Sequence, residues 1–561
     1  MKKRKLILTL VSLFSLIAVV ACDVKNKDNS DLNEFEQAGT EDEVEYPTVN
    51  LTAYEGENYI FDDTISNKDG SVSYEIFVRS FYDTDNDGVG DFNGVRQKLP
   101  YLKDLGIKTV WLMPIMPSPS YHGYDVTDYY DVNPDYGTMS DFEMLLNDAK
   151  SHNIDIMIDI VFNHSSTRNQ WFRQSYQDYL AGNTGEGSKA DWYCWSETSR
   201  TGYAEYSNGK YYECRFDRSM PDFNTKNEEV RAEMINILKY WATKGVKGFR
   251  FDAVKYFDFE NTLYNVEFMS YLHDEIVKEF PDIYFVGECW DNINIINSYY
   301  KSSFESFFAF GSSIDSFGNA TILGQAKALN PANEFGRMIE QREKIMKENN
   351  PNAYSSYFIS NHDMDRASKS LVGHYAKQAA SLYLLLPGTP YMYYGEEIQI
   401  QGVRQSSDMS DARRRLPMIW SATDKTGQCA FPEQNRPDLM DNTQETKGAL
   451  DRMEEDYSLW NHYKKVIQIR NKYPFIKNSI FKNYTYQVQG IYKNVLVYEL
   501  SYGNESIIVV HNFGKVNAEI DLSVINVASI LDEVSVSKLR PELNNNILKI
   551  GKWSTVVLSR K

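Results

Sequence analysis

The chain has 561 residues, a length that predicts two or three domains with sizeable hydrophobic cores. Its formal net charge of −19 argues against nucleic acid or an anionic membrane surface as a partner, because both repel an acidic protein. The 40 tyrosines raise the aromatic share to 14%, which favours a carbohydrate ligand because aromatic faces stack on sugar rings, although tyrosine also fills cores.

The first 22 residues are typical of a targeting signal. Residues 2–5 are basic, and residues 6–20 form an apolar run too short for a comfortable bilayer span. Residues 19–22, Val-Val-Ala-Cys, resemble the lipobox of bacterial lipoproteins. This predicts a lipid-modified Cys22 and a mature chain secreted and then anchored to the outer face of the cell membrane. The alternative is an ordinary secretory signal in which Cys22 is a coincidence.

An acidic segment follows the signal. Residues 23–46 are rich in Asp, Glu and Asn and carry few large apolar side chains. Such a segment cannot bury enough surface to order itself. We therefore expect residues 23–70 to form a flexible tether.

Eight strand-like segments come next, most of them followed by a helical pattern, which is typical of parallel βαβ units. They centre on Ile76, Leu112, Ile158, Arg250, Val286, Ser306, Phe358 and Met392, of which Ser306 is the least distinct. Eight such units predict an α/β fold of the (β/α)8, or TIM barrel, type over residues 71–163 and 220–472. The long interval between the third and fourth strands predicts an inserted domain B at residues 164–219.

Beyond residue 472 the pattern changes to short segments that alternate or are β-branched, around Val497, Val509 and Val556. Turn residues such as Gly503 separate these segments. Residues 473–561 therefore predict a C-terminal all-β domain, a small sandwich.

Four cysteines remain besides Cys22, and they allow three disulfide pairings among which the sequence does not choose. They are Cys194, Cys214, Cys289 and Cys429. Cys194 with Cys214 is the most local pairing, and none of the four has metal-ligand spacing.

Three apolar segments each end in a carboxylate, Asp252, Glu288 or Asp363, as buried parallel strands do when they deliver acids into an active site. Retaining cleavage of a glycosidic bond needs two carboxyl groups roughly 5 Å apart, and Asp252 and Glu288 end consecutive predicted strands. Arg250 shares a strand face with Asp252 and favours its ionised form, which suits a nucleophile. The less polar surroundings of Glu288 favour a general acid. An ion-paired barrel core without catalysis is the alternative.

Several segments together resemble α-amylases of glycoside hydrolase family 13, over the chain beyond about residue 71. They are residues 159–164 (Asp-Ile-Val-Phe-Asn-His), 220–224 (Met-Pro-Asp-Phe-Asn), 248–255, 286–288 and 361–363, in the family's order. The form of residues 220–224 resembles the subgroup intermediate between oligo-1,6-glucosidases and neopullulanases. The resemblance implies a retaining hydrolase that cleaves internal α-1,4-glucosidic bonds of starch, glycogen-like polymers and maltooligosaccharides by double displacement.

The resemblance also implies residue roles. Asp252 becomes the nucleophile, Glu288 the acid/base, and Asp363 the acid that grips and distorts the sugar at the cleavage point. The implied substrate contacts are His122, Tyr124, His164, Arg250, Lys255, Tyr256 and His362. Lys255 and Tyr256 line the leaving-group side in this assignment.

Residues 83–91, Asp-Thr-Asp-Asn-Asp-Gly-Val-Gly-Asp, follow the alternating oxygen-ligand pattern of a Ca²⁺ loop. The predicted ligands are Asp83, Asp85, Asp87, the Val89 carbonyl and Asp91. The glutamate that completes an EF-hand is absent, so this is not an EF-hand, and a solvated acidic turn is the alternative. The resemblance implies a second Ca²⁺ site through Asn163, Asp222 and the Tyr256 carbonyl, which some relatives lack.

Other activities of the same site stay open: α-glucosidase, neopullulanase or maltogenic hydrolase, and 4-α-glucanotransferase. Oligo-1,6-glucosidase relatives tend to carry Asp where His122 stands, which favours α-1,4 cleavage here. A non-catalytic, glycan-binding barrel lipoprotein is the alternative from another class, but such members usually lose a catalytic acid. We expect a monomer with an α-glucan substrate, no nucleic-acid partner, and membrane contact through the lipid anchor only.

Overall fold

The computed structural model describes residues 59, 61, 72–311, 321–404, 411–432, 447–488, 490 and 492–561. The predicted signal, with Cys22, lies outside the described residues, as does most of the predicted tether. Tyr59 belongs to the segment predicted as a tether. Its hydroxyl lies 2.9 Å from Nδ1 of His462 on α13 (Leu459–Lys472), so Tyr59 is packed against that helix. Within the described ranges, no helix is both long and apolar enough to cross a membrane.

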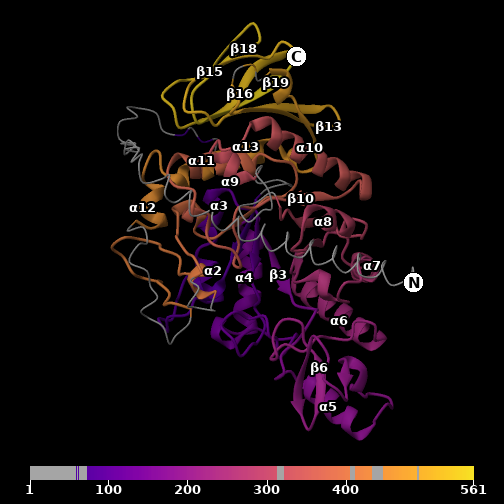
Figure 1. Cartoon of the computed structure of the whole chain (residues 1–561). Coiled ribbons are helices and arrows are strands. Elements are labelled where there is room, and N and C mark those ends of the chain that lie inside the picture. The colour runs from indigo at the N-terminus through magenta and orange to yellow at the C-terminus, as the bar shows by residue number, and fades with distance from the viewer. Residues whose placement is uncertain are drawn as a thin grey trace, which may run out of the picture. The chain divides into compact units, whose positions relative to one another are not determined.

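Eight parallel strands form the barrel (Figure 1). They are β1 (Ser73–Ile76), β2 (Thr109–Leu112), β3 (Asp155–Ile160), β7 (Gly248–Phe251), β8 (Tyr284–Gly287), β9 (Ser306–Phe308), β10 (Tyr354–Ser356) and β11 (Tyr391–Tyr393). The hydrogen-bonded order is β10-β9-β8-β7-β3-β2-β1-β11. The N–H of Tyr391 donates to the Tyr357 carbonyl at 2.7 Å and joins the two ends of that order. The predicted TIM barrel is therefore confirmed.

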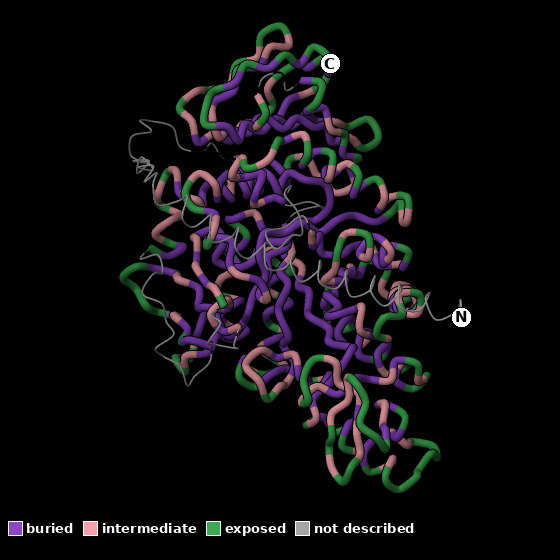
Figure 2. Tube along the Cα trace, in the orientation of Figure 1, coloured by how far each residue is buried: buried purple, intermediate pink, exposed green. Residues whose placement is uncertain are grey.

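The seventh strand begins earlier than the sequence pattern predicts. It spans Tyr354–Ser356, whereas the pattern centres on Phe358. Residues 357–359 are buried although they follow the strand. Tyr357 still accepts the Tyr391 N–H, so it is for Phe358 and Ile359 that hydrophobicity reports burial rather than sheet pairing. Figure 2 shows the buried trace concentrated in the barrel strands.

Helices follow the strands and cover the barrel. They are α2 (Phe92–Gln97), α3 (Leu99–Leu105), α4 (Met139–Ser151), α6 (Glu228–Lys244), α7 (Thr262–Val277), α8 (Ile293–Tyr299), α9 (Ile322–Ala326), α10 (Ala332–Asn349), α11 (His374–Leu384), α12 (Ala449–Met453) and α13. The start of α4 is fixed by a capping box between Thr138 and Asp141. Gly245 ends α6 with a φ of 111°, a conformation that favours glycine.

A small antiparallel insert follows β3, as predicted. It contains α5 (Gln170–Ala181) and a sheet in the order β4 (Trp195–Ser196), β6 (Lys210–Glu213), β5 (Tyr203–Ser207). Phe172 of α5 packs against Trp195 and Tyr212 of this sheet, at ring-centroid distances of 5.2 and 5.0 Å. The aromatic residues of the insert thus make its own core.

The four described cysteines are free thiols. Cys194 lies opposite Glu213, because the Glu213 N–H donates to the Cys194 carbonyl at 3.0 Å. Neighbouring strand residues point to opposite faces, so the side chain of Cys214 points away from Cys194. The most local of the pairings that the sequence allows is therefore not formed.

The C-terminal region contains two antiparallel sheets. One has the order β12 (Ile480–Asn483), β13 (Val495–Tyr502), β14 (Glu505–Asn512), β19 (Ser554–Arg560), β16 (Val527–Ser535), and the other β15 (Ala518–Asp521), β18 (Ile547–Ile550), β17 (Glu542–Asn544). A short helix, α14 (Thr485–Val488), precedes β13. Val495 and Val497 face the core between the sheets, whereas Leu496 and Tyr498 pack into the barrel core. Burial on both faces explains why β13 is apolar without alternation.

Candidate active site

A single buried guanidinium collects three acids at the carboxyl end of the barrel. Arg250 on β7 is 1% exposed, and its Nη1 donates to Asp159 Oδ1 at 2.8 Å and to Asp252 Oδ1 at 2.8 Å. Its Nη2 lies 3.1 Å from Glu288 Oε2. Arg250 and Asp252 point to the same side because strand residues two apart share a face. One positive charge therefore faces three carboxyl groups.

The backbone holds the two candidate catalytic acids beside each other. The Asp252 N–H donates to the Ile160 carbonyl at 3.0 Å, and the Glu288 N–H donates to the Phe251 carbonyl at 2.9 Å. Ala253 adopts a left-handed conformation (φ 47°), and its N–H donates to Glu288 Oε2 at 2.9 Å. Strain at Ala253 thus accompanies a turn that aims a backbone donor at the carboxylate.

Burial shifts both acids toward their protonated forms. It raises the pKa of Asp252 to about 6 and the pKa of Glu288 to about 7, against the lowering effect of Arg250. The sequence predicted that Arg250 would favour an ionised Asp252, and its charge does act in that direction. It does not prevail, because burial outweighs it and the same charge is shared with Asp159 and Glu288. Glu288 still keeps its proton to higher pH than Asp252.

Asp363 has a different environment. Its Oδ1 accepts from Arg415 Nη2 at 3.0 Å, and its Oδ2 lies 2.9 Å from His362 Nε2. Burial raises the pKa of Asp363, but His362 and Arg415 outweigh it and hold that pKa well below its usual range. Asp363 is therefore ionised at neutral pH.

His362 lies between two acids. Its Nδ1 is 2.5 Å from Glu75 Oε1, and its Nε2 faces Asp363. Burial lowers the pKa of His362, but Asp363 and Glu75 outweigh it and raise that pKa to about 10. The imidazole is thus a cation at neutral pH.

Tyr124 joins this group from the loop after β2. Its hydroxyl lies 2.6 Å from His362 Nε2 and 3.2 Å from Asp159 Oδ2, and its ring stacks on His362 at 5.6 Å between centroids. Nδ1 of His122 accepts the Tyr124 N–H at 3.1 Å, and burial lowers the pKa of His122. The structure therefore brings Tyr124, His362 and Arg250 together with the predicted acids Asp252, Glu288 and Asp363. His122 is hydrogen-bonded to the backbone of Tyr124.

His164 lies on the insert side of the site. Its ring packs on Phe216 at 5.2 Å between centroids, and burial lowers its pKa to about 3, so it is neutral. Nε2 of His164 is buried and has no hydrogen-bond partner among the described residues. A buried ring nitrogen without a partner is costly, and a ligand hydroxyl would supply one.

Lys255 and Tyr256 contact residues other than the predicted acids Asp252, Glu288 and Asp363. Nζ of Lys255 donates to the Trp290 carbonyl and to Asp291 Oδ2, both at 2.9 Å. The ring of Tyr256 lies 4.7 Å from that of Phe216, which also packs on His164. Tyr256 is therefore linked to His164 through an aromatic contact.

Three partners of the site were not singled out from the sequence: Glu75, Asp159 and Arg415. Asp159 and Glu75 are charged residues inside apolar strand segments, a signal that could have marked them as facing a site. Arg415 closes a run of three arginines at 413–415, which by itself reads as a solvated patch. Its role follows only from its contact with Asp363.

The acidic loop after β1 forms a carboxylate cluster. Oxygens of Asp83, Asp85 and Asp91 lie within 4.8 Å of one another. Oδ1 of Asp87 instead accepts the Val89 N–H at 2.7 Å, and Asp87 is not a member of the cluster. Clustered carboxylate oxygens are the ligands that Ca²⁺ prefers, so the donor set fits this ion.

Two residues of the predicted second metal site also lie together. Nδ2 of Asn163 donates to Asp222 Oδ1 at 3.1 Å, and Asn163 Oδ1 is buried with no partner among the described residues. Burial and the nearby Glu213 raise the pKa of Asp222 well above its usual value.

Comparisons with known proteins give consistent matches. The alpha amylase catalytic-domain family matches residues 75–479. Alpha-amylase 3 of Dictyoglomus thermophilum is 38% identical over 503 residues, covering 87% of this chain and 93% of that protein. Maltase A1 of Drosophila melanogaster is 29% identical, covering 80% and 88%.

Among solved structures, Eubacterium rectale Amy13B superposes with a TM-score of 0.82 at 30% identity, covering 89% of this chain and 97% of that one. An alpha-amylase from H. orenii superposes with a TM-score of 0.75 at 32% identity, covering 88% and 100%.

Proposed function

The chain belongs to the alpha-amylase family and is a glycoside hydrolase that acts on α-glucans, and on that premise we propose that it is an α-amylase. It cleaves internal α-1,4-glucosidic bonds of starch, glycogen-like polymers and maltooligosaccharides with retention of configuration. The observation that carries this proposal is the pair Asp252 and Glu288 on one guanidinium, with the higher pKa on Glu288. Two carboxyl groups held by one guanidinium are close enough for the roughly 5 Å separation of retaining enzymes.

In the first step, the Asp252 carboxylate attacks the anomeric carbon while protonated Glu288 donates its proton to the departing glycosidic oxygen. The C–O bond to the leaving group breaks, and a glycosyl ester of Asp252 forms. In the second step, the Glu288 carboxylate takes a proton from water, and that water attacks the anomeric carbon. The ester bond breaks and both acids return to their starting forms.

Asp363 binds sugar hydroxyls in this proposal. His362 and Arg415 keep this carboxylate ionised. An ionised carboxylate accepts strong hydrogen bonds, here from the sugar hydroxyls. The bonds to the sugar tighten as the ring flattens toward the oxocarbenium geometry, so they lower the barrier rather than only improving binding. His122, Tyr124 and His164 contact the same sugar, and Lys255 and Tyr256 lie toward the leaving group.

α-Glucosidase activity is the second candidate, because a maltase is also among the similar proteins. A product assay on soluble starch, maltotriose, pullulan and isomaltose separates the two. An α-amylase yields a spread of maltooligosaccharides early in starch digestion. Release of glucose alone, from chain ends, would favour the α-glucosidase, and extended oligosaccharides from maltotriose would favour a 4-α-glucanotransferase.

We also propose that the loop of Asp83, Asp85 and Asp91 holds Ca²⁺, with Asp87 and the Val89 carbonyl as further oxygen ligands. The support is the carboxylate cluster and its hard oxygen donors. The ion would stabilise the loop by neutralising mutually repelling charges. A second Ca²⁺ at Asn163, Asp222 and the Tyr256 carbonyl is supported by the unpartnered Oδ1 of Asn163.

The location outside the cytoplasm, with a lipid anchor at Cys22, rests on residues 1–22 of the sequence alone. A Cys22→Ser variant should be released or left unprocessed, whereas the unchanged chain should fractionate with membranes. Recovery of the unchanged chain in the soluble fraction without detergent would refute the anchor.

A further inference from the structure

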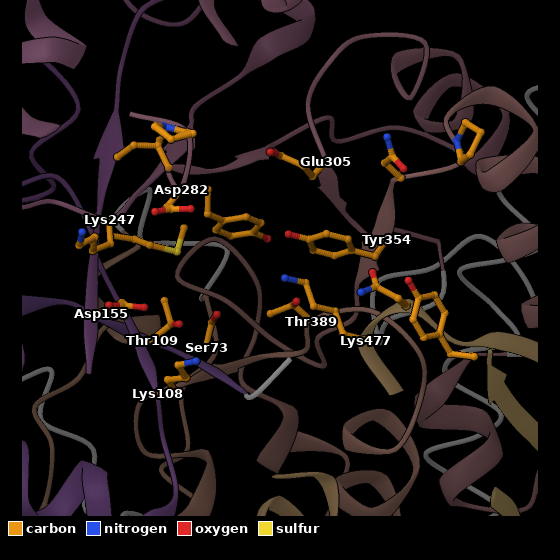
Figure 3. Close-up of a pocket in the computed structure, with 18 of the residues that line it drawn as sticks. Ser73, Lys108, Thr109, Asp155, Lys247, Asp282, Glu305, Tyr354, Thr389 and Lys477 are labelled. Carbon is orange, nitrogen blue, oxygen red and sulfur yellow. The ribbon is translucent and has the colours of Figure 1, made fainter. Parts of the chain in front are cut away.

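A polar cavity of about 500 Å³ opens at the amino ends of the barrel strands (Figure 3). Ser73, Thr109, Asp155 and Tyr354, the first residues of β1, β2, β3 and β10, line it. The volume falls in the range of small-ligand sites, about 300–1,000 Å³.

This cavity is separate from the candidate active site. Lys247, just before β7, lines the cavity, and Asp252, just after β7, belongs to the active site. Five residues of extended chain span about 16 Å. Buried side chains such as Trp111 and Phe308 fill the barrel between the two ends. A ligand in the cavity therefore cannot touch the catalytic acids.

Charges of both signs line the cavity. The cations are Lys108, Lys247, Lys347 and Lys477, and the acids are Asp155, Asp282 and Glu305. Figure 3 shows Lys247, Asp155 and Asp282 on one side, with Glu305 and Tyr354 across from them. An anion would meet the acids and a cation would meet the lysines. A neutral ligand whose hydroxyls both donate and accept hydrogen bonds matches both sets.

Glu305 offers one such hydrogen bond directly. Its Oε1 lies 3.3 Å from His273 Nε2, whereas its Oε2 is buried and has no partner among the described residues. A buried carboxylate oxygen without a donor is costly, which points to a donor from outside the chain. A ligand hydroxyl would be such a donor.

Aromatic rings border the cavity. The Tyr354 ring is held between Tyr284, at 6.0 Å between centroids, and the Lys477 ammonium, at 4.5 Å from its centre. Tyr502, at the end of β13, also lines the cavity and is 54% exposed. An exposed ring beside hydroxyl-binding groups suits the apolar face of a sugar.

A second groove of about 810 Å³ lies beside the cavity, between α10 and β12. Lys347 lines both spaces. The outer groove also presents Ile480, which is 66% exposed, beside Phe481. Two spaces that share a lining residue suit a chain that reaches both better than a compact molecule.

We propose that the cavity and its adjoining groove bind a segment of an α-glucan chain at a non-catalytic site. This inference rests on the proposed α-glucan substrate. Since the two sites lie at opposite ends of the barrel, they bind different chains, or distant parts of one polymer. The second site would keep the enzyme on the polymer and raise the local substrate concentration for the active site.

The test is calorimetric binding of maltoheptaose to the full chain carrying Asp252→Asn, which prevents turnover. Two molecules per chain are expected. Adding Lys247→Ala, Asp282→Ala and Tyr502→Ala should leave one molecule per chain and weaken retardation in starch-containing native gels at least about fivefold. The exposed triple Lys301→Ala, Asp521→Ala and Tyr486→Ala is the matched control and should change neither result.

The cavity variants, placed in the otherwise unchanged chain, should hydrolyse maltotriose within twofold of its normal rate. One maltoheptaose per chain before and after the cavity substitutions would overturn the inference, as would cavity-dependent binding of inorganic phosphate without maltoheptaose. If the unchanged chain hydrolyses no α-glucan, the proposed function is refuted instead. Failure of the second binding site and failure of the proposed function are therefore distinguishable.

Discussion

Nη2 of Arg250 lies 3.1 Å from Oε2 of Glu288. The same guanidinium binds Asp252 and Asp159, so full ionisation would bury three negative charges around one positive charge. Retaining a proton within this group relieves that repulsion. Glu288, whose pKa burial raises to about 7, is the acid that supplies the catalytic proton in our account.

The pH dependence of activity should be bell-shaped. Asp252, with a pKa raised to about 6, must be ionised to attack, so kcat/KM should fall as pH drops below about 6. Glu288, with a pKa raised to about 7, must be protonated to donate, so kcat/KM should fall as pH rises above about 7. The two limbs report the pair rather than isolated residues. Initial rates on maltoheptaose across pH 4 to 9 would measure them, and a flat profile would contradict the assignment.

Removal of either central acid should nearly abolish turnover. Asp252→Asn removes the nucleophile and Glu288→Gln the proton donor, so each should lower kcat roughly 10⁴-fold. Both replacements are nearly isosteric, and unchanged circular dichroism would establish that the fold is retained. Turnover within tenfold of normal in a folded variant would remove that residue from the mechanism.

Glu75 should act by keeping His362 charged. Glu75→Gln should lower kcat about tenfold, a barrier increase of about 1.4 kcal/mol, because His362 loses a partner for its positive charge. His362 has a folded pKa raised to about 10. Its charge therefore contributes stability that is fully present below its unfolded pKa, about 6.5, and is lost as pH rises through 10.

The Tm gap between the unchanged chain and Glu75→Gln should therefore be largest near pH 6 and shrink toward pH 10. Glu519→Gln, an exposed replacement on β15, is the control and should show no such gap. A gap that does not depend on pH would mean that Glu75 is only a packing residue.

Calcium should stabilise the fold more than it affects chemistry. Ca²⁺ that binds only the folded chain raises Tm with concentration. EDTA should therefore lower Tm, and Asp85→Asn with Asp87→Asn should remove most of that dependence, whereas Asp191→Asn at an exposed site should not. An unchanged Tm after chelation, together with no metal by elemental analysis, would show that the acidic turn is merely solvated.

The barrel was predictable because each strand and helix repeats a local pattern, and the interval after Ile158 marked the insert. The seventh strand was placed too far along the chain because Phe358 and Ile359 are apolar for a reason other than pairing. The candidate catalytic acids Asp252 and Glu288 could be singled out because each ends an apolar segment, and their catalytic roles stay a prediction. Their supporting contacts were not, since Glu75 and His362 are 287 residues apart and meet only in the folded barrel.

The most direct test of the account is to trap the covalent intermediate. The Glu288→Gln variant should still react with α-maltosyl fluoride, because fluoride leaves without a proton donor, but it lacks the base that activates water for the second step. Mass spectrometry of a digest should then find a maltosyl ester on the peptide that contains Asp252. A maltosyl group on another carboxylate, or inverted β-maltose released without any labelled peptide, would contradict the proposed mechanism.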